Sequence, residues 1–242
     1  MLGFLGFTCN RALSSESMNN KFIQIDDNGE GLIEIPRFFI VEPMYFKQGL
    51  TSDDSMLLRE GIVEKLLRVK RHLPKGWNFK IWDGYRPLSV QDKLHKGLWD
   101  LRSKENPSWD EAELKKAVEK FVAFPSYDPA KPSPHNTGGA VDLTIVTDDG
   151  IELPMGTEFD EFHERSYSDY FLDQDRHDDS GAGDGASFEA RVHQSNRDLL
   201  RELIASEGFA PYKWEWWHFS FGNQDWAAHS GNEVAIYGSK EL

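Results

Sequence analysis

The chain has 242 residues, which is long enough for one large domain or two small ones with a buried core. Hydrophobic residues make up 39% of it and aromatic residues 13%, a composition typical of folded globular proteins and not of disordered ones. The formal net charge of -14 disfavours binding to nucleic acid or to an anionic membrane surface, because both carry negative charge. The single cysteine, Cys9, excludes an intramolecular disulfide framework and a zinc site made of several cysteines.

The N-terminus begins with a short apolar stretch that lacks the basic region of a signal peptide. We therefore expect residues 1–20 to form a loosely ordered tail and residues 21–242 to form one domain without a membrane-inserted segment. The cytoplasm is the expected location. The alternative is the periplasm, which requires the apolar stretch to act as an export signal. Residues 172–186, rich in Gly and Asp, are expected to form a flexible acidic loop.

In the first half of the chain, apolar segments alternate with turn residues. Leu58, Ile62 and Leu66 recur at the helical period. Pro87 is well placed to open a later helix, after a short strand and a turn. The elements expected here are a strand at 31–41, a helix at 55–72, a strand at 78–83 and a helix that starts at Pro87. Ser108 with Glu111 has the spacing of a capping box, which predicts another helix behind it.

The second half begins with a proline-rich loop at 124–139. The elements expected after it are a strand at 140–146, a turn at 148–150, a helix at 187–206 and an aromatic strand at 212–221. Grouped helices and strands joined by short turns predict an α+β fold, with a central, mainly antiparallel sheet flanked by helices.

Two polar residues at the entrance of the strand at 140–146 point to a metal site. His135 ends the proline-rich loop, and two glycines allow the chain to fold back before Asp142. An Asp between apolar strand residues must be paired or bound to a metal ion if it is buried. The alternative is a simple hydrogen bond between His135 and Asp142.

A second pair, Glu215 and His218, lies within the aromatic segment. His218 would complete a set of two His and one carboxylate, and catalytic zinc sites use three such ligands and a water. Glu215 would act as general base on that water. In a regular strand, residues three apart face opposite sides, so the strand must bend, bulge or begin between them. The alternative is a surface Glu beside a core His.

Two further segments carry charges that suit a substrate with charged ends. Arg86 lies on a strand-to-helix turn and could hold a carboxylate or stabilise an oxyanion, or it could be paired with Asp83 or Glu215. Residues 148–185 contain 13 acidic residues and two arginines, so most of the net charge lies there. Asp160 in this segment could bind a free ammonium group, whereas most of the rest has the character of a solvated acidic loop.

Together these segments resemble the zinc D-alanyl-D-alanine dipeptidases of the VanX type. The matching residues are Ser133, His135, Gly138, Ala140 and Asp142 in S-x-H-x-x-G-x-A-x-D, Glu215, Trp217 and His218 in E-x-W-H, Gly84–Pro87 in G-Y-R-P, and Met155–Asp160 in M-G-T-x-F-D. The motifs occur in the family's order and span most of the chain. The resemblance is weaker over residues 36–50, a region that helps to close the pocket in the family.

The resemblance implies a compact α+β fold shared with zinc D,D-carboxypeptidases and the hedgehog signalling domain. It implies one zinc ion per chain on three ligands, with Glu215 as catalytic base and Arg86 polarising the scissile carbonyl. Ser133 and Asp160 match positions that contact the dipeptide, and Asp160 would pair with its amine. The zinc ligands that it implies are His135, Asp142 and His218.

The implied reaction is hydrolysis of the small substrate D-Ala-D-Ala to two D-alanines. Two alternatives stay open at this point. One is a carboxypeptidase or endopeptidase of the same fold that acts on longer peptidoglycan stem peptides. The other is a binding module that keeps zinc for stability without catalysis. The sequence does not indicate an oligomeric state.

Overall fold

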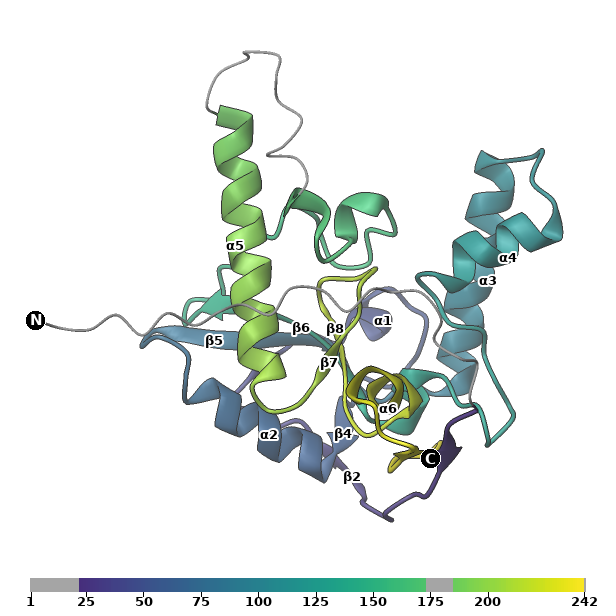
Figure 1. Ribbon diagram of the computed structural model, residues 1–242, viewed down its shortest axis with the longest axis horizontal. Coiled ribbons are helices and arrows are strands. Elements are labelled where there is room, and N and C mark those ends of the chain that lie inside the picture. The colour runs from purple at the N-terminus through teal and green to yellow at the C-terminus, as the bar shows by residue number, and fades with distance from the viewer. Residues whose placement is uncertain (1–21, 173–184, 242) are drawn as a thin grey trace, which may run out of the picture.

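The computed structural model of the chain describes residues 22–172 and 185–241 (Figure 1). The tail expected at 1–20 and most of the acidic loop expected at 172–186 lie outside the described residues. At the edges of that loop, Leu172 ends a short 3₁₀ turn and Gly185 begins a helix. One domain over residues 21–242 stays a prediction.

A five-stranded sheet in the order β3-β5-β6-β8-β7 forms the centre of the fold. Its strands are β3 (Ile40–Val41), β5 (Trp77–Asp83), β6 (Ala140–Thr147), β7 (Ala210–Pro211) and β8 (His218–Ser220). β3 runs parallel to β5, and the other neighbours are antiparallel. The structure therefore confirms the predicted α+β class with a mainly antiparallel sheet.

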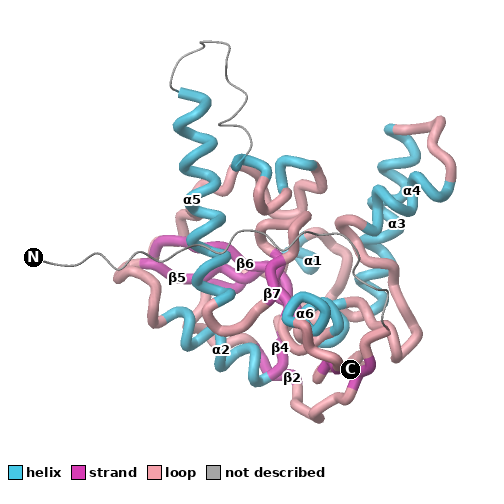
Figure 2. Tube along the Cα trace, viewed as in Figure 1, coloured by secondary structure: helices cyan, strands magenta, loops and turns pink. Residues whose placement is uncertain are grey.

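Helices and two small strand pairs surround this sheet (Figure 2). The helices are α1 (Met44–Lys47), α2 (Glu60–Lys70), α3 (Leu88–Glu105), α4 (Glu111–Glu119), α5 (Gly185–Ala205) and α6 (Gln224–Ser230). The strand pairs are β1 (Gln24–Ile25) with β9 (Val234–Ala235) and β2 (Leu32–Glu34) with β4 (Leu57–Arg59). Helix α5 and the α3–α4 pair rise on opposite sides of the molecule (Figure 1). The described residues contain no helix long and apolar enough to cross a membrane.

The two faces of the central sheet have different roles. On β6, Val141, Leu143 and Ile145 are fully buried in the main core, which also contains residues of α2 and α5. Because side chains alternate along a strand, Asp142 and Thr144 point to the opposite face. One face of β6 thus packs in the apolar core, while the other carries polar groups.

A second, smaller apolar cluster joins α3 to α4. Its buried members are Leu98, Val118 and Val122, and Phe121 and Phe162 pack against them. Helix α4 begins with a capping box formed by Asp110 and Glu113, in which each side chain accepts a backbone N–H of the other residue. The helix predicted behind Ser108 and Glu111 is present. Its capping box, however, lies two residues after that predicted pair.

The strand predicted at 31–41 is wrong, because the segment forms two strands with different partners. β2 pairs with β4, whereas β3 pairs with β5 in the central sheet. Pro36 between them has no N–H to donate to a ladder, and a turn follows it. The helix predicted at 55–72 begins only at Glu60, since Leu57–Arg59 is used in β4.

The strand predicted at 212–221 is also wrong. The chain forms β7, turns through residues 212–217 and enters β8 at His218. Other predictions hold: β5, α3 and β6 lie where the pattern placed them, and α5 overlaps the helix predicted at 187–206. Leu101 on α3 is exposed.

Candidate metal centre and active site

Three polar residues lie side by side across the polar face of the sheet. In the register of β5 with β6, Asp83 lies opposite Asp142, and in the register of β6 with β8, Asp142 lies opposite His218. Residues directly opposite one another on neighbouring strands share a face and have their Cβ atoms about 4.5–5.5 Å apart. Strand pairing alone therefore brings two carboxylates and an imidazole together.

The short 3₁₀ turn η1 (Pro134–Thr137) adds His135 to this row. Gly138 ends the turn in the left-handed conformation (φ 69°), and a Cβ atom there would lie 2.4 Å from a side-chain carbon of Leu32. This position therefore requires glycine for both its conformation and its contact. The backbone N–H of Arg86 donates to the carbonyl of His135 (3.2 Å), which links the turn to the loop after β5.

Arg59 holds the far side of this turn. Its side chain is fully buried, and its Nε atom donates to the carbonyl of Thr137 (2.7 Å). Its other nitrogens donate to the carboxylate of Asp27 (2.7 Å) and to the carbonyls of Glu30 (2.6 Å) and Gly238 (2.8 Å). One guanidinium thus joins the turn that carries His135 to segments near both ends of the chain.

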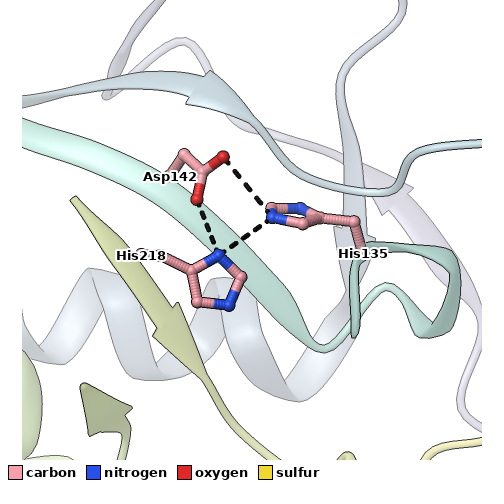
Figure 3. A group of neighbouring side chains, drawn as sticks. All are labelled: His135, Asp142 and His218. Carbon is pink, nitrogen blue, oxygen red and sulfur yellow. Dashed lines mark hydrogen bonds and ion pairs between the residues drawn. The ribbon is translucent and has the colours of Figure 1, made fainter. Parts of the chain in front are cut away.

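The side chains of His135, Asp142 and His218 converge on one point (Figure 3). Nε2 of His135 lies 3.1 Å from Nδ1 of His218 and 3.4 Å from Oδ2 of Asp142. Nδ1 of His218 lies 3.0 Å from Oδ1 of Asp142. Ligand atoms on a tetrahedral zinc ion, each about 2.0–2.1 Å from the metal, are separated by about 3.3 Å. The three side chains therefore approach one another at distances close to those between zinc ligands, with the Asp142 carboxylate turning one oxygen toward each imidazole.

The outer nitrogens of both imidazoles face oxygen atoms. Nδ1 of His135 lies 2.8 Å from the carbonyl oxygen of Gly84 and must donate to it, since a carbonyl only accepts. Nε2 of His218 lies 3.3 Å from Oγ of Ser220. With these outer nitrogens as donors, the inner nitrogens present lone pairs to the common point, as metal-binding imidazoles do. The residues present fit a bound zinc ion.

Asp142 is kept ionised at this point. Burial by itself raises the pKa of a carboxyl, but the charges and hydrogen bonds of His135 and His218 hold the pKa of Asp142 well below its usual range. A carboxylate beside two imidazoles is a donor set that catalytic zinc sites use.

Glu215 lies in the turn that precedes β8, and not in the strand. The strand begins at His218, so Glu215 and His218 reach the same site without a bulge, which is one of the three solutions that the sequence allowed. Oε2 of Glu215 lies 3.9 Å from Nδ1 of His218. Burial, together with the nearby carboxylates of Asp142 and Asp160, raises the pKa of Glu215 well above its usual range. A carboxyl that accepts a proton this readily suits proton transfer.

Arg86 is buried beside the three donor residues. Its Nε atom donates to Oδ2 of Asp83 (2.8 Å), and its terminal nitrogens donate to Gln91 (2.9 Å) and to the hydroxyl of Tyr45 (2.9 Å). A terminal nitrogen also lies 3.6 Å from Oδ2 of Asp142. The ion pair of Arg86 with Asp83, which the sequence allowed as an alternative, is therefore present. It orients the guanidinium beside the site.

Asp160 reaches the same site from the loop after β6. Burial, together with the charges of Asp142 and Asp83 and against the opposing charge of Arg86, raises the pKa of Asp160 to about 7. Among the described residues other than glycine, Asp160 alone has a positive φ, 59°. This conformation costs an L-residue roughly 1–2 kcal/mol, and such strain is concentrated at functional sites.

A cavity of about 450 Å³ opens onto these residues. Its floor includes His135, Asp142, His218, Glu215 and Arg86. The rest of the lining comes from Tyr45 and Gln91, from the last residue of α4 and the segment that follows it (Glu119, Phe121, Val122, Ala123, Phe124 and Ser126), and from Lys131, Pro132, Ser133, Pro134, Asp160, Phe162, Tyr212 and Asp225. The structure thus brings all seven residues singled out in the sequence to one cavity.

Ser133 is notable within that wall. Its side chain is buried, and its hydroxyl has no hydrogen-bond partner among the described residues. A buried polar atom without a partner is costly, and a ligand group in the cavity would satisfy it.

The sequence did not indicate that Tyr45 and Gln91 belong to the site. It also did not indicate that Asp83 joins Arg86 to His135. The carboxylate Oδ2 of Asp83 contacts both Arg86 and Nδ1 of His135 (3.1 Å). Gln91 accepts from Arg86 and donates to the carbonyl of Ala123 (2.6 Å). Arg86 precedes α3 and Gln91 lies five residues beyond Arg86, which is neither of the helical contact spacings, so the sequence spacing gave no signal. Tyr45 lies in a segment without any such signal.

Two imidazoles and a carboxylate with their donor atoms turned inward lie beside a buried carboxyl and a guanidinium at the floor of a cavity. This is the arrangement expected of a metal-dependent hydrolase.

Comparisons with known proteins agree with that class. The model of the D-Ala-D-Ala dipeptidase family, Peptidase M15, matches residues 19–234. The D-alanyl-D-alanine dipeptidase of Synechocystis sp. is 30% identical over 208 residues, which cover 76% of this chain and 79% of that protein. The D-alanyl-D-alanine dipeptidase of Enterococcus faecium is 29% identical over 167 residues, 65% of this chain and 69% of that protein.

One solved structure, described as VanYB in complex with D-Alanine-D-Alanine, is 16% identical with a TM-score of 0.42, and the match covers 88% of this chain and 93% of that one. The chain belongs to the D-Ala-D-Ala dipeptidase family of M15 peptidases, which are metallopeptidases.

Proposed function

We propose that the protein binds one zinc ion through His135, Asp142 and His218 and hydrolyses D-Ala-D-Ala to two D-alanines. The observation that carries the proposal is the convergence of two imidazole nitrogens and the Asp142 carboxylate, with nearest distances of 3.0–3.4 Å between them, beside a buried carboxyl of raised pKa. Membership of the D-Ala-D-Ala dipeptidase family supports the choice of substrate.

The protein groups divide the chemistry between them. A bound zinc ion lowers the pKa of water and polarises a carbonyl group. Glu215 is placed to take a proton from the attacking water and to return it to the leaving amine. Arg86 is placed to stabilise the negative charge that develops on the carbonyl oxygen of the scissile bond. Because Asp83, Gln91 and Tyr45 already fix its guanidinium, little reorganisation is needed during the reaction.

The two ends of the dipeptide require different partners. Asp160, ionised when a cation is nearby, would pair with the free ammonium group, because an opposite charge favours the charged carboxylate. The unpaired hydroxyl of Ser133 would donate to an oxygen of the substrate.

The test combines metal analysis with assays of three substrates. The purified protein should contain one zinc per chain and release D-alanine from D-Ala-D-Ala, with much slower release from N-acetyl-D-Ala-D-Ala. Equal rates on the free and the blocked dipeptide would remove the ammonium partner from the proposal. Preference for a longer stem peptide would instead identify a carboxypeptidase. Zinc without hydrolysis of any of the three would identify a binding module.

The cytoplasmic location stays a prediction from the sequence. Cell fractionation with an antibody against the protein tests it, and recovery from the periplasm would favour export through the N-terminal stretch.

A further inference from the structure

The loop that carries Asp160 is closed by a residue that the proposed chemistry does not use. The loop follows β6 and runs from Met155 to Tyr167. Asp160 lies within it in the strained left-handed conformation. Such a conformation persists only where the surroundings over-determine it. The contacts that hold this loop therefore decide where the carboxylate of Asp160 lies.

Arg197, a buried residue of α5, makes three of these contacts. Its Nε atom donates to the carbonyl of Met155 (2.7 Å), and its terminal nitrogens donate to the carbonyls of Tyr167 (2.7 Å) and Arg165 (2.9 Å). These carbonyls lie on both sides of Asp160 in the sequence. One planar guanidinium thus clamps the two ends of the loop together.

The electrostatic setting of Arg197 is unusual. Its side chain is only 2% exposed, and among the described residues its hydrogen-bond acceptors are neutral carbonyls. Its guanidinium lies over the rings of Phe171 (4.7 Å) and Trp216 (5.8 Å). A buried cation that is not hydrogen-bonded to a carboxylate carries a desolvation cost that an apolar residue would avoid. An apolar residue at this position would avoid that cost, but it could not donate hydrogen bonds to the three carbonyls.

The same loop is fastened from the opposite side by the turn that carries Glu215. The indole N–H of Trp216 donates to the hydroxyl of Thr157 (2.8 Å), and the backbone N–H of Trp216 donates to the carbonyl of Ser166 (3.1 Å). Movement of the loop would therefore be felt by Asp160 and, through Trp216, by the residue next to the proposed base.

We propose that Arg197 is a positioning residue for substrate recognition: it sets the loop so that Asp160 meets the ammonium group of the dipeptide. This inference rests on the proposed role of Asp160 in binding that group. A residue that only anchored α5 would affect stability but not the preference for a free amine. The ratio of kcat/KM for D-Ala-D-Ala to that for N-acetyl-D-Ala-D-Ala, called here the free-amine preference, separates these two roles.

The variants Arg197→Met, Arg197→Lys and Thr157→Val test the proposal in the zinc-loaded full chain. Arg197→Met keeps the apolar contacts and removes the donors. It should lower kcat/KM for D-Ala-D-Ala about 10- to 100-fold, mainly through KM, since misplacement by about 1 Å can cost 100-fold. The free-amine preference should fall by a similar factor, with unchanged zinc content. Arg197→Lys, which restores one donor group, should recover part of the loss.

Thr157→Val removes the acceptor of the Trp216 indole and loosens the same loop at lower risk to the fold. It should lower the free-amine preference in the same direction by a smaller factor. Arg201→Ala is the matched control, because Arg201 lies on the same helix but binds Asp169 and Asp198 near the surface (2.6 and 2.5 Å). That variant should keep the wild-type preference.

The results separate this inference from the proposed function. The free-amine preference of the wild-type protein reports on the role of Asp160, and the change in the variants reports on Arg197. A strong wild-type preference that survives in Arg197→Lys and Thr157→Val, even with a lower Tm, would overturn the positioning role alone. The absence of any wild-type preference would overturn both. If Arg197→Met does not fold, the other two variants still decide.

Discussion

The cavity has two walls that are built in different ways. On the sheet wall, Asp83, Asp142 and His218 occupy adjacent positions on three strands, so the backbone ladder fixes their spacing. On the loop wall, residues 119–126 and the segment around Asp160 come from connections outside the sheet. A ladder is held by many backbone hydrogen bonds, whereas a loop depends on a few side chains.

The side chains that hold the loop wall are buried and polar. Gln91 links Arg86 to the carbonyl of Ala123, and Arg197 clamps the segment around Asp160. The contrast implies a division of labour: the sheet wall, together with the adjoining turns that carry His135, Arg86 and Glu215, holds the groups that react, and the loop wall holds those that select the substrate. Changes to the sheet wall should therefore lower kcat, and changes to the loop wall should raise KM.

Removal of the metal should have the largest effect on the sheet wall. Dialysis against a chelator should abolish turnover, and zinc should restore it, because the donor atoms of His135, Asp142 and His218 then lose their common partner. His135→Ala should bind zinc weakly and stay inactive after zinc is added, while the exposed His72→Ala should behave as wild type. Full activity in the chelated protein, verified by metal analysis, would break the assignment of this wall to catalysis.

Glu215→Ala should have the next largest effect. We expect retention of zinc and a loss in kcat of about 100- to 10,000-fold, the range typical for removal of a general acid or base. The measurement is steady-state kinetics together with metal analysis of the same sample. Glu207→Ala is a suitable control, since Glu207 pairs with Arg68 away from the cavity. Hydrolysis at the wild-type rate in Glu215→Ala would exclude Glu215 as the base.

Arg86→Lys should lower kcat about 100- to 1,000-fold, a magnitude typical of a lost oxyanion donor. A lysine cannot reproduce the contacts of the guanidinium with Asp83, Gln91 and Tyr45 together. Kinetic constants on D-Ala-D-Ala give the readout, with the partly exposed Arg68→Lys as control. An effect confined to KM would show that Arg86 binds the substrate and does not stabilise the transition state.

Asp160→Asn should act on KM. Asparagine tolerates the left-handed conformation, so the loop should persist while the charge is lost. We expect a 10- to 100-fold rise in KM for D-Ala-D-Ala, since a hydrogen bond to a charged group contributes about 1.5–3 kcal/mol, and little change for the N-acetyl dipeptide. A loss of kcat with KM unchanged would contradict the division between the walls.

The smallest effect concerns the pH dependence of stability in the metal-free protein. Burial raises the pKa of Asp160 from 3.8 to about 7, so the folded state binds this proton more tightly than the unfolded state. Stability should be fully present below about pH 4 and should decline as the pH rises through 7, by no more than about 4 kcal/mol from this group. Urea unfolding between pH 4 and 8 measures the decline. Asp160→Asn should reduce it, leaving the similar contribution of Glu215; an equal decline in both proteins would contradict the shift at Asp160.

The sheet wall could be predicted from the sequence better than the loop wall. The apolar residues on either side of Asp142 indicated a carboxylate that must be paired or bound to a metal if it is buried, and the glycines after His135 indicated that the chain folds back. The split of 31–41 into β2 and β3 could not be read from its apolar content, because the two halves pair with strands distant in sequence. Arg197 was missed for a related reason: periodicity predicts a buried face from apolar residues, and its partners are backbone carbonyls more than 25 residues away.

The contacts of the buried Arg59 bear on the order in which parts of the chain fold during synthesis. It binds Asp27, Thr137 and Gly238, which lie 32, 78 and 179 residues from it in the chain. During synthesis the N-terminal part emerges first, so the turn that carries His135 leaves the ribosome long before the segment at Gly238. Contacts this distant in sequence form late, since the loops between them must close first. The turn that carries His135 thus gains its full set of contacts through Arg59 only after the segment at Gly238 has been made.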